Sequence, residues 1–312
     1  MRVLVIGGTG FIGRQIVGRL VAQGHVVQVP TRHFAHGRDL LVYPLATVFE
    51  ADVNDEQTLQ RMVAGSDAVI NLVGILHSRP GRPYGSDFDR AHVQLPRRIA
   101  QACRQQGVKR LLHMSALGAN AQGPSGYLRS KAAGEQAIRE VFESWPEGAY
   151  TLFRASVVFG PDDQFLNMFA RLARLFPVLP MAGASARMQP VFVGDVAAAI
   201  TNALENPRTF GKTYDLAGSR VYTLGELVKL AAGWAGAPRP VLEMPQVIGR
   251  MQAMFFECMP GVPLMSRDNL DSLSVDNVSE GAMDAELGVV ATPLESVAPV
   301  YLARTASADE RH

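Results

Sequence analysis

Three residues in the middle of the chain have the types and spacing for proton transfer to a carbonyl oxygen. Ser115 is followed twelve residues later by Tyr127, and Lys131 comes four residues after the tyrosine. If residues 127–143 form a helix, Tyr127 and Lys131 lie on one face, one turn apart. A free tyrosine exchanges protons poorly at neutral pH because its pKa is near 10, and an ammonium beside it lowers that pKa. We predict Tyr127 as the acid/base, Ser115 as the carbonyl-binding hydroxyl and Lys131 as the charged partner.

A glycine-rich turn at the start of the chain predicts the cofactor that such chemistry needs. The apolar run 3–6 is typical of a strand buried on both faces, and residues 11–21 have apolar side chains at helical spacing. The turn between them fits G-x-G-x-x-G, in which glycines allow the backbone to approach a pyrophosphate at a helix N-terminus. The alternative is a strand–helix turn without a ligand. The residues of this predicted nucleotide site are Gly7, Gly8, Thr9, Gly10, Phe11, Ile12 and Gly13.

The end of the second predicted strand, residues 25–30, bears on the choice of cofactor. An acidic residue about 20 positions beyond the glycines would bind the ribose 2′-hydroxyl of NAD, and none is present. Arg32 and His33 stand there instead, and an arginine can hold a 2′-phosphate through a charge-assisted contact. We therefore predict NADP(H) rather than NAD(H). The alternative for Arg32 is a solvated loop arginine.

Strands and helices alternate through the first 150 residues. Further strands are expected at 48–51, 68–72 and 110–114, with helices at 56–64 and 91–106 between them. This order favours an α/β fold with a doubly wound parallel Rossmann sheet. Parallel strands of such sheets bind ligands at their carboxyl ends. The segment 75–88 follows one of those ends, so it is expected either to meet an anionic substrate or to be a solvated loop.

These motifs together resemble the extended or atypical short-chain dehydrogenase/reductases, the NAD-dependent epimerase/dehydratase superfamily. The resemblance covers roughly residues 1–230 and includes the segments 154–161 and 189–197. Within that superfamily the chain is most similar to the bacterial relatives of the nucleotide-binding accessory subunit of respiratory complex I. It implies further cofactor-binding residues after successive strands, and Lys131 as a contact to the nicotinamide ribose. The further residues are Asp52, Val53, Leu72, Val73, Gly74, Ala155 and Val157.

Two departures from that superfamily affect the expected activity. Many members that act on sugar nucleotides have an acidic residue where this chain has Arg32, and paired hydroxyl residues where it has Met114 and Ser115. Three hypotheses follow. The first is an NADP(H)-dependent oxidoreductase that transfers hydride to or from a carbonyl or alcohol. The second is an NADP(H)-bound structural or assembly protein, and the third is a nucleotide-sugar epimerase or dehydratase.

The composition of the chain limits the kinds of partner and compartment that we expect for it. Of 312 residues, 30 are basic and 29 acidic, which excludes the charge excess of a nucleic-acid binder or a polybasic membrane anchor. Two distant cysteines, Cys103 and Cys258, suggest neither a disulfide framework nor a metal cluster and fit a reducing compartment. No apolar stretch is long enough to span a membrane. We predict a cytoplasmic protein with a small-molecule substrate and no metal. The resemblance also implies association with a respiratory complex, at the inner membrane through a partner; a homodimer through helices 91–106 and 127–143 is the alternative.

The second half of the chain predicts a smaller C-terminal substrate lobe. We expect a dinucleotide-binding domain at 1–160, a mixed α/β substrate lobe interleaved with it at 161–304, and a disordered tail at 305–312. Residues 245–260 have apolar residues on one helical face: Val247, Met251, Met254, Phe255 and Cys258. Such a stripe usually packs into a core, and the alternative is a surface for a hydrophobic ligand or partner.

Overall fold

A seven-stranded parallel sheet forms the centre of the larger lobe in the computed structural model, which describes residues 1–257 and 265–309. Its strand order is β11-β6-β5-β4-β1-β2-β3, and every neighbouring pair is parallel. The predicted doubly wound α/β fold is therefore confirmed. The strands are β1 (Arg2–Ile6), β2 (Val26–Thr31), β3 (Ala46–Glu50), β4 (Ala68–Asn71), β5 (Arg110–Ala116), β6 (Ala149–Ala155) and β11 (Lys212–Leu216).

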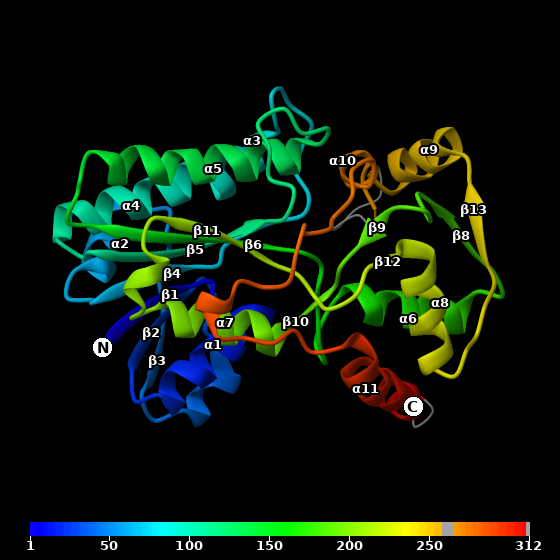
Figure 1. Cartoon of the computed structure of the whole chain (residues 1–312), viewed down its shortest axis with the longest axis horizontal. Coiled ribbons are helices and arrows are strands. Elements are labelled where there is room, and N and C mark those ends of the chain that lie inside the picture. Colours follow the sequence, from blue (N-terminus) through cyan, green and yellow to red (C-terminus); the bar gives the residue numbers. More distant parts are fainter. Residues whose placement is uncertain (258–264, 310–312) are drawn as a thin grey trace.

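Helices cover both faces of this sheet (Figure 1). One apolar core packs α1 (Phe11–Ala22) and α7 (Val193–Ala203) on one face. A second core packs α2 (Glu56–Val63), α4 (Leu95–Gln106) and α5 (Gly126–Glu143) on the other. The strand order reverses between β1 and β4, and ligands of open α/β sheets bind at such a switch point.

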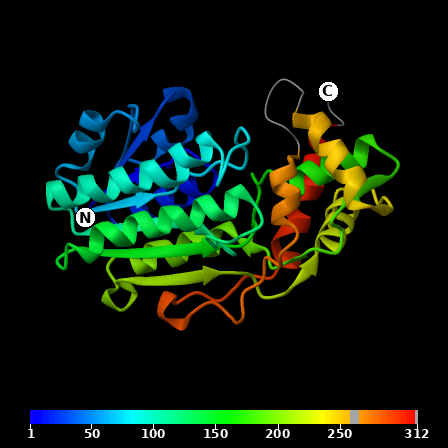
Figure 2. The same cartoon turned by 90° about the horizontal axis from the view of Figure 1, so that it is seen from above.

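The smaller lobe lies beside the sheet, as Figure 2 shows from above. Its core is formed by α6 (Phe165–Leu175), α8 (Leu224–Trp234) and α11 (Leu294–Asp309). Short strands pair there and at the junction: β7 (Val158–Phe159) with β10 (Val191–Phe192), β8 (Leu179–Ala182) with β13 (Val241–Met244), and β9 (Arg187–Met188) with β12 (Tyr222–Thr223). The remaining elements are α3 (Ser86–Phe88), α9 (Gln246–Glu257), α10 (Arg267–Ser272) and the short helices η1 (Phe34–Val42), η2 (Asp89–Gln94), η3 (Pro207–Thr209) and η4 (Ala285–Leu287).

Two expected elements differ from the structure. The helix expected at 91–106 is composed of two parts, a π-helical turn η2 followed by α4, which starts at Leu95 beside Pro96. Helix α11 continues to Asp309, whereas a disordered tail is expected from residue 305. The two lobes interleave, because β11 and α7 belong to the sheet lobe although both follow residue 161.

The apolar stripe of α9 does not pack into a core. Gly249 and Ala253 are the buried residues of this helix, and a Cβ at Gly249 would lie 2.2 Å from the Cβ of Ala182, so the small side chains let α9 lie flat on β8. Val247, Met251 and Phe255 are 70%, 63% and 65% exposed, and Met254 is half exposed. The expectation of a core helix is wrong, because the residues that pack are the small ones; Cys258 lies outside the described residues.

Candidate functional site

The glycine turn is shaped to hold an anion. Gly7 has φ +85°, and a Cβ at Gly13 would lie 2.4 Å from the carbonyl oxygen of Gly7, so helix α1 approaches the turn more closely than any larger residue allows. The N–H groups of Phe11, Ile12 and Gly13 have no hydrogen-bond partner among the described residues. Free N–H groups at a helix N-terminus bind phosphate, so the turn fits a dinucleotide pyrophosphate. Thr9 contributes its backbone carbonyl to Arg14.

The predicted cofactor residues at the ends of β2 and β3 lie close enough to interact. Arg32 and His33 follow β2 directly, and both are exposed. Asp52 accepts hydrogen bonds from the backbone and side-chain nitrogens of Asn54, which lower the pKa of its carboxyl, and the charge of Arg32 lowers that pKa further. Val53 packs against the core under α2 and α4. The Arg32 guanidinium is therefore near Asp52, at the carboxyl end of the sheet.

The loop after β4 connects the glycine turn to Lys131. A Cβ at Gly7 would lie 3.2–3.3 Å from atoms of Leu72 and Val73, which places this loop directly on the turn. A Cβ at Gly74 would lie 3.7 Å from Nζ of Lys131. The loop therefore runs from the glycine turn to the predicted proton-transfer site.

Tyr127 and Lys131 occupy one face of α5. The Tyr127 ring packs edge-on against Phe88 and His92, with ring centroids 5.9 and 5.6 Å away, and its side chain keeps some solvent exposure. Lys131 is buried, and its Nζ donates a hydrogen bond of 2.9 Å to the carbonyl oxygen of Met114. Burial lowers the pKa of Lys131 to about 8, an effect that the Glu135 carboxylate opposes.

The pKa of Tyr127 differs from the expectation. Burial raises it to about 12, and in this structure the Lys131 ammonium is hydrogen-bonded to a carbonyl group rather than to the phenol. The lowering expected from Lys131 is not present in this structure, where burial of the phenol is what raises the pKa. A phenol in this state is protonated at neutral pH and is a weaker acid than a free tyrosine.

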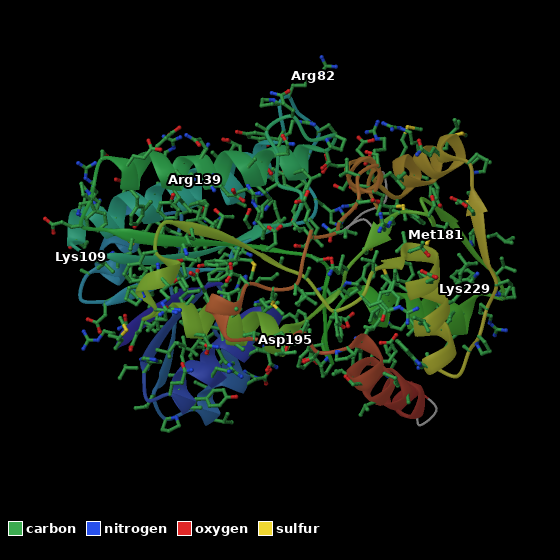
Figure 3. All side chains as sticks on the ribbon, in the orientation of Figure 1. Arg82, Lys109, Arg139, Met181, Asp195 and Lys229 are labelled. Carbon is green, nitrogen blue, oxygen red and sulfur yellow. The ribbon has the colours of Figure 1, made fainter. Side chains whose placement is uncertain are left out.

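Ser115 has a different hydrogen-bond partner from this pair in the structure. It is within β5, and its Oγ donates a hydrogen bond of 2.6 Å to Oε1 of Glu135. Arg154 binds both oxygens of the same carboxylate at 2.8 and 2.7 Å, and Arg139, labelled in Figure 3, donates a bond of 3.3 Å. Among the described residues no hydrogen bond joins Ser115 to Tyr127 or Lys131. The geometry therefore assigns the Ser115 hydroxyl to a buried ion-pair cluster.

Removal of the carboxylate from that cluster is expected to destabilise the fold. Glu135 is 1% exposed, so Glu135→Ala leaves two arginines beside a cavity, and breaking a buried pair costs roughly 3–5 kcal/mol. Both arginines keep about a third of their side chains exposed, so we expect the lower end of that range. Chemical denaturation measures the change. The control is Glu140→Ala, because Glu140 is on the same helix as Glu135 and forms a surface ion pair with Arg97 of α4; its loss should cost less than about 1 kcal/mol. Equal losses of stability in the two variants would contradict a buried pair.

Two further predicted cofactor residues lie beyond β5. Ala155 ends β6, and Val157 accepts a backbone hydrogen bond from Val191 at the start of β10. A Cβ at Gly160 would lie 3.2 Å from the ring of Phe11, so this segment returns to the glycine turn. The structure thus gathers all the predicted cofactor segments at the carboxyl edge of the sheet. Among the described residues it shows no group of three His, Cys, Asp or Glu that could hold a metal, and no described helix is long and apolar enough to cross a membrane.

Comparisons with known proteins agree with this arrangement. The model of the NAD dependent epimerase/dehydratase family matches residues 3–217, which include the glycine turn, Tyr127, Lys131 and β11. The chain belongs to this family. As a family member it is similar to NADH dehydrogenase (ubiquinone) 1 alpha subcomplex subunit 9 of Mus musculus, with 34% identity over 299 residues that cover 93% of this chain and 77% of the mouse protein. The predicted relation to a complex I subunit is confirmed.

The chain is also similar to a protein named as a reductase and to a solved structure of the same fold. Ceramide reductase of Caulobacter vibrioides is 29% identical over 249 residues, which cover 78% of this chain and 73% of that enzyme. The solved structure of Pal from Bacillus thuringiensis superposes with a TM-score of 0.77 at 14% identity and covers 99% of both chains. The last likeness shows the fold alone. Relatives at comparable identity thus include both a respiratory-chain subunit and a reductase.

Sequence reasoning missed His92, which connects Tyr127 to the cofactor loop. The N–H of Ile75 donates to Nε2 of His92, so Nε2 is the acceptor, and Nδ1 must carry the hydrogen shared with Oγ of Ser130 at 2.8 Å. Ser130 Oγ in turn donates to the carbonyl oxygen of Tyr127. Burial lowers the pKa of His92 to about 2, so the ring stays neutral. The sequence held no signal for the π-helical turn that places this ring.

Proposed function

We propose that this protein is an NADP(H)-dependent oxidoreductase that transfers hydride between the nicotinamide and a carbonyl or alcohol carbon. The observation that carries the proposal is the pair Tyr127 and Lys131 on one face of α5, beside Gly74 of the loop that contacts the glycine turn. A cofactor-binding fold does not by itself require a partly exposed phenol next to a buried lysine. Family membership supports nucleotide binding, and the Caulobacter relative named as a reductase supports turnover.

The proposed roles follow from the state of each group. A bound nicotinamide would supply or accept the hydride. Tyr127, a phenol that is protonated at neutral pH, donates its proton to the carbonyl oxygen as negative charge develops there. Lys131, with a pKa near 8, is mostly charged at neutral pH and stabilises the phenolate that is left; its side chain also lies where it can hold the nicotinamide ribose. His92 stays neutral and keeps α5 and the cofactor loop in register.

The proposed substrate is a small hydrophobic carbonyl compound. The relative named ceramide reductase is, by its name, a reductase of a lipid, which supports a hydrophobic substrate. A panel of ketones and quinones with NADPH, followed by absorbance, tests the proposal. Mass spectrometry of the nucleotide released from purified protein identifies the cofactor. If the protein binds NADPH but none of the acceptors in the panel causes NADPH to be oxidised, the enzyme assignment is contradicted.

A second candidate function is an NADP(H)-bound structural or assembly protein. It is favoured by 34% identity to a subunit of NADH dehydrogenase and by the engagement of Ser115 with Glu135 instead of the reacting pair. In that case the nucleotide stabilises the fold and no hydride is transferred. The third candidate is a nucleotide-sugar epimerase or dehydratase, and the family's name favours it. Such an enzyme would need a tightly held NAD, and Arg32 after β2 argues against NAD as the cofactor.

Arg32→Ala tests the cofactor. Loss of a charge-assisted contact to a 2′-phosphate should weaken NADPH by about 1.5–3 kcal/mol, roughly 10- to 150-fold in Kd, with NADH almost unchanged. Fluorescence titration of both nucleotides measures the difference. Arg61→Ala, an exposed arginine on α2, is the matched control and should alter neither affinity. Equal losses for NADPH and NADH would remove Arg32 from the phosphate site.

A further inference from the structure

The first turn of α5 is completed by the other lobe. Ser125, the N-cap, accepts a hydrogen bond from the N–H of Leu128 through its Oγ. The N–H groups of Gly126 and Tyr127 donate instead to Oδ1 and Oδ2 of Asp268, at 2.6 and 3.0 Å. One carboxylate, 141 residues beyond Tyr127 in sequence, therefore binds two of the four N–H groups that the start of an α-helix leaves without an intrahelical partner.

Asp268 belongs to the smaller lobe. It is on α10, which Figure 1 shows between α9 and the end of α5. Arg250 pairs with Asp271 at 2.9 Å and Arg267 with Glu257 at 2.9 Å, so α10 is fixed to α9 by two ion pairs. Helix α10 also has its own capping box between Ser266 and Asn269. The carboxylate that caps α5 is therefore held by the smaller lobe, not by the sheet.

Further contacts show that the two surfaces fit each other. Ser272 donates through its Oγ to Oγ of Ser125 at 2.8 Å, and Nδ2 of Asn269 donates to the carbonyl oxygen of Leu76 at 3.3 Å. Helix α10 thus contacts both the α5 cap and the loop that follows β4. A Cβ at Gly126 would lie 3.1 Å from Oδ1 of Asp268, so a glycine at this position permits the short contact.

We propose that Asp268 is a positioning residue for Tyr127, an inference that rests on the proposed oxidoreductase function. The Tyr127 ring is held by Phe88 and His92 from the sheet lobe, whereas its backbone N–H is held by Asp268. The first turn of α5 contains no acidic residue of its own, so Asp268 also supplies the negative charge that a helix N-terminus favours. A displacement of the smaller lobe would move the Tyr127 backbone directly, which couples the lobe to the proton donor.

Three variants of the full chain test this role. Asp268→Ala removes both acceptors, and Asp268→Asn keeps one acceptor oxygen without the charge. The matched control is Glu243→Ala, which removes an exposed carboxylate from β13 of the same lobe. We expect Asp268→Ala to retain its NADPH Kd within about twofold and to lose roughly tenfold or more in the rate of hydride transfer at saturating acceptor, with Asp268→Asn in between. Glu243→Ala should match the wild type.

Hydrogen exchange of the peptide containing residues 124–131 provides a readout that needs no turnover. Exchange at Gly126 and Tyr127 should be faster in Asp268→Ala than in Glu243→Ala. Equal exchange in those two variants, or faster exchange with an unchanged hydride-transfer rate, would overturn the positioning role. A wild type that reduces no acceptor overturns the proposed function instead, and the exchange result then decides alone whether the lobe is coupled to α5.

Discussion

Tyr127→Phe should lower the rate of hydride transfer by roughly two to four orders of magnitude, the range that general acid–base catalysis contributes. The substitution removes the phenol oxygen alone. No described residue forms a hydrogen bond with that oxygen, and the ring contacts to Phe88 and His92 remain, so folding and NADPH affinity should change little. Single-turnover absorbance of NADPH with the best acceptor of the panel measures the effect.

Two comparisons make that result decisive. Tyr150→Phe removes a phenol oxygen from β6, where the ring packs on Phe142, and should leave the rate unchanged. Lys131→Ala should reduce affinity and rate together, because it removes both the ammonium and the proposed ribose contact. If the protein is a nucleotide-bound scaffold, Tyr127→Phe is silent in every assay, and Lys131→Ala shows as weaker nucleotide binding and a lower Tm.

Gly10→Val should abolish nucleotide binding in a folded protein. Gly10 is the N-cap of α1 with φ −77° and ψ 175°, an extended conformation that valine adopts readily. A Cβ there would meet the carbonyl oxygen of Gly7 at 3.3 Å and no other atom within 4 Å outside its chain neighbours and its own helix. The branched side chain would therefore extend into the space in front of the free N–H groups, where a pyrophosphate would lie.

Calorimetric titration with NADPH measures the loss, and circular dichroism checks the fold. Gly233→Val is the matched control, because a Cβ at this exposed position of α8 has open space around it. Unchanged affinity in a folded Gly10→Val protein would place the nucleotide site elsewhere in the chain.

Local sequence patterns were enough to predict the sheet and the segments that lie at its carboxyl edge. A strand, a glycine turn and a helix in succession can pack together in only a few ways, and parallel strands bring their carboxyl ends to one edge of the sheet. The pair Tyr127 and Lys131 followed from helical spacing alone. Glu135 could have been found by the same rule, since it lies one further turn along the same face of α5.

The parts of the site that the sequence did not predict depend on orientation or on distant contacts. Alternate residues of a strand face opposite sides, so the direction of Ser115 depends on register within β5, which its spacing to Tyr127 does not determine. The cap from Asp268 joins residues 141 positions apart, and nothing in either local sequence marks the pair. The stripe of α9 has the periodicity of a core helix, yet the small residues on its other face are the ones that pack.

The position of β11 affects how the chain folds during synthesis. This strand completes the sheet beside β6, yet it is made about 60 residues after β6 ends. At ribosomal rates of about 5–20 residues per second, β6 is exposed as a sheet edge for on the order of 3–12 s before its partner is synthesised. Open edges pair with other chains, and the N-terminal 160 residues expressed alone would keep this edge permanently. The sheet lobe is thus the first part of the molecule to begin folding, but its sheet is complete only after β11 has been synthesised.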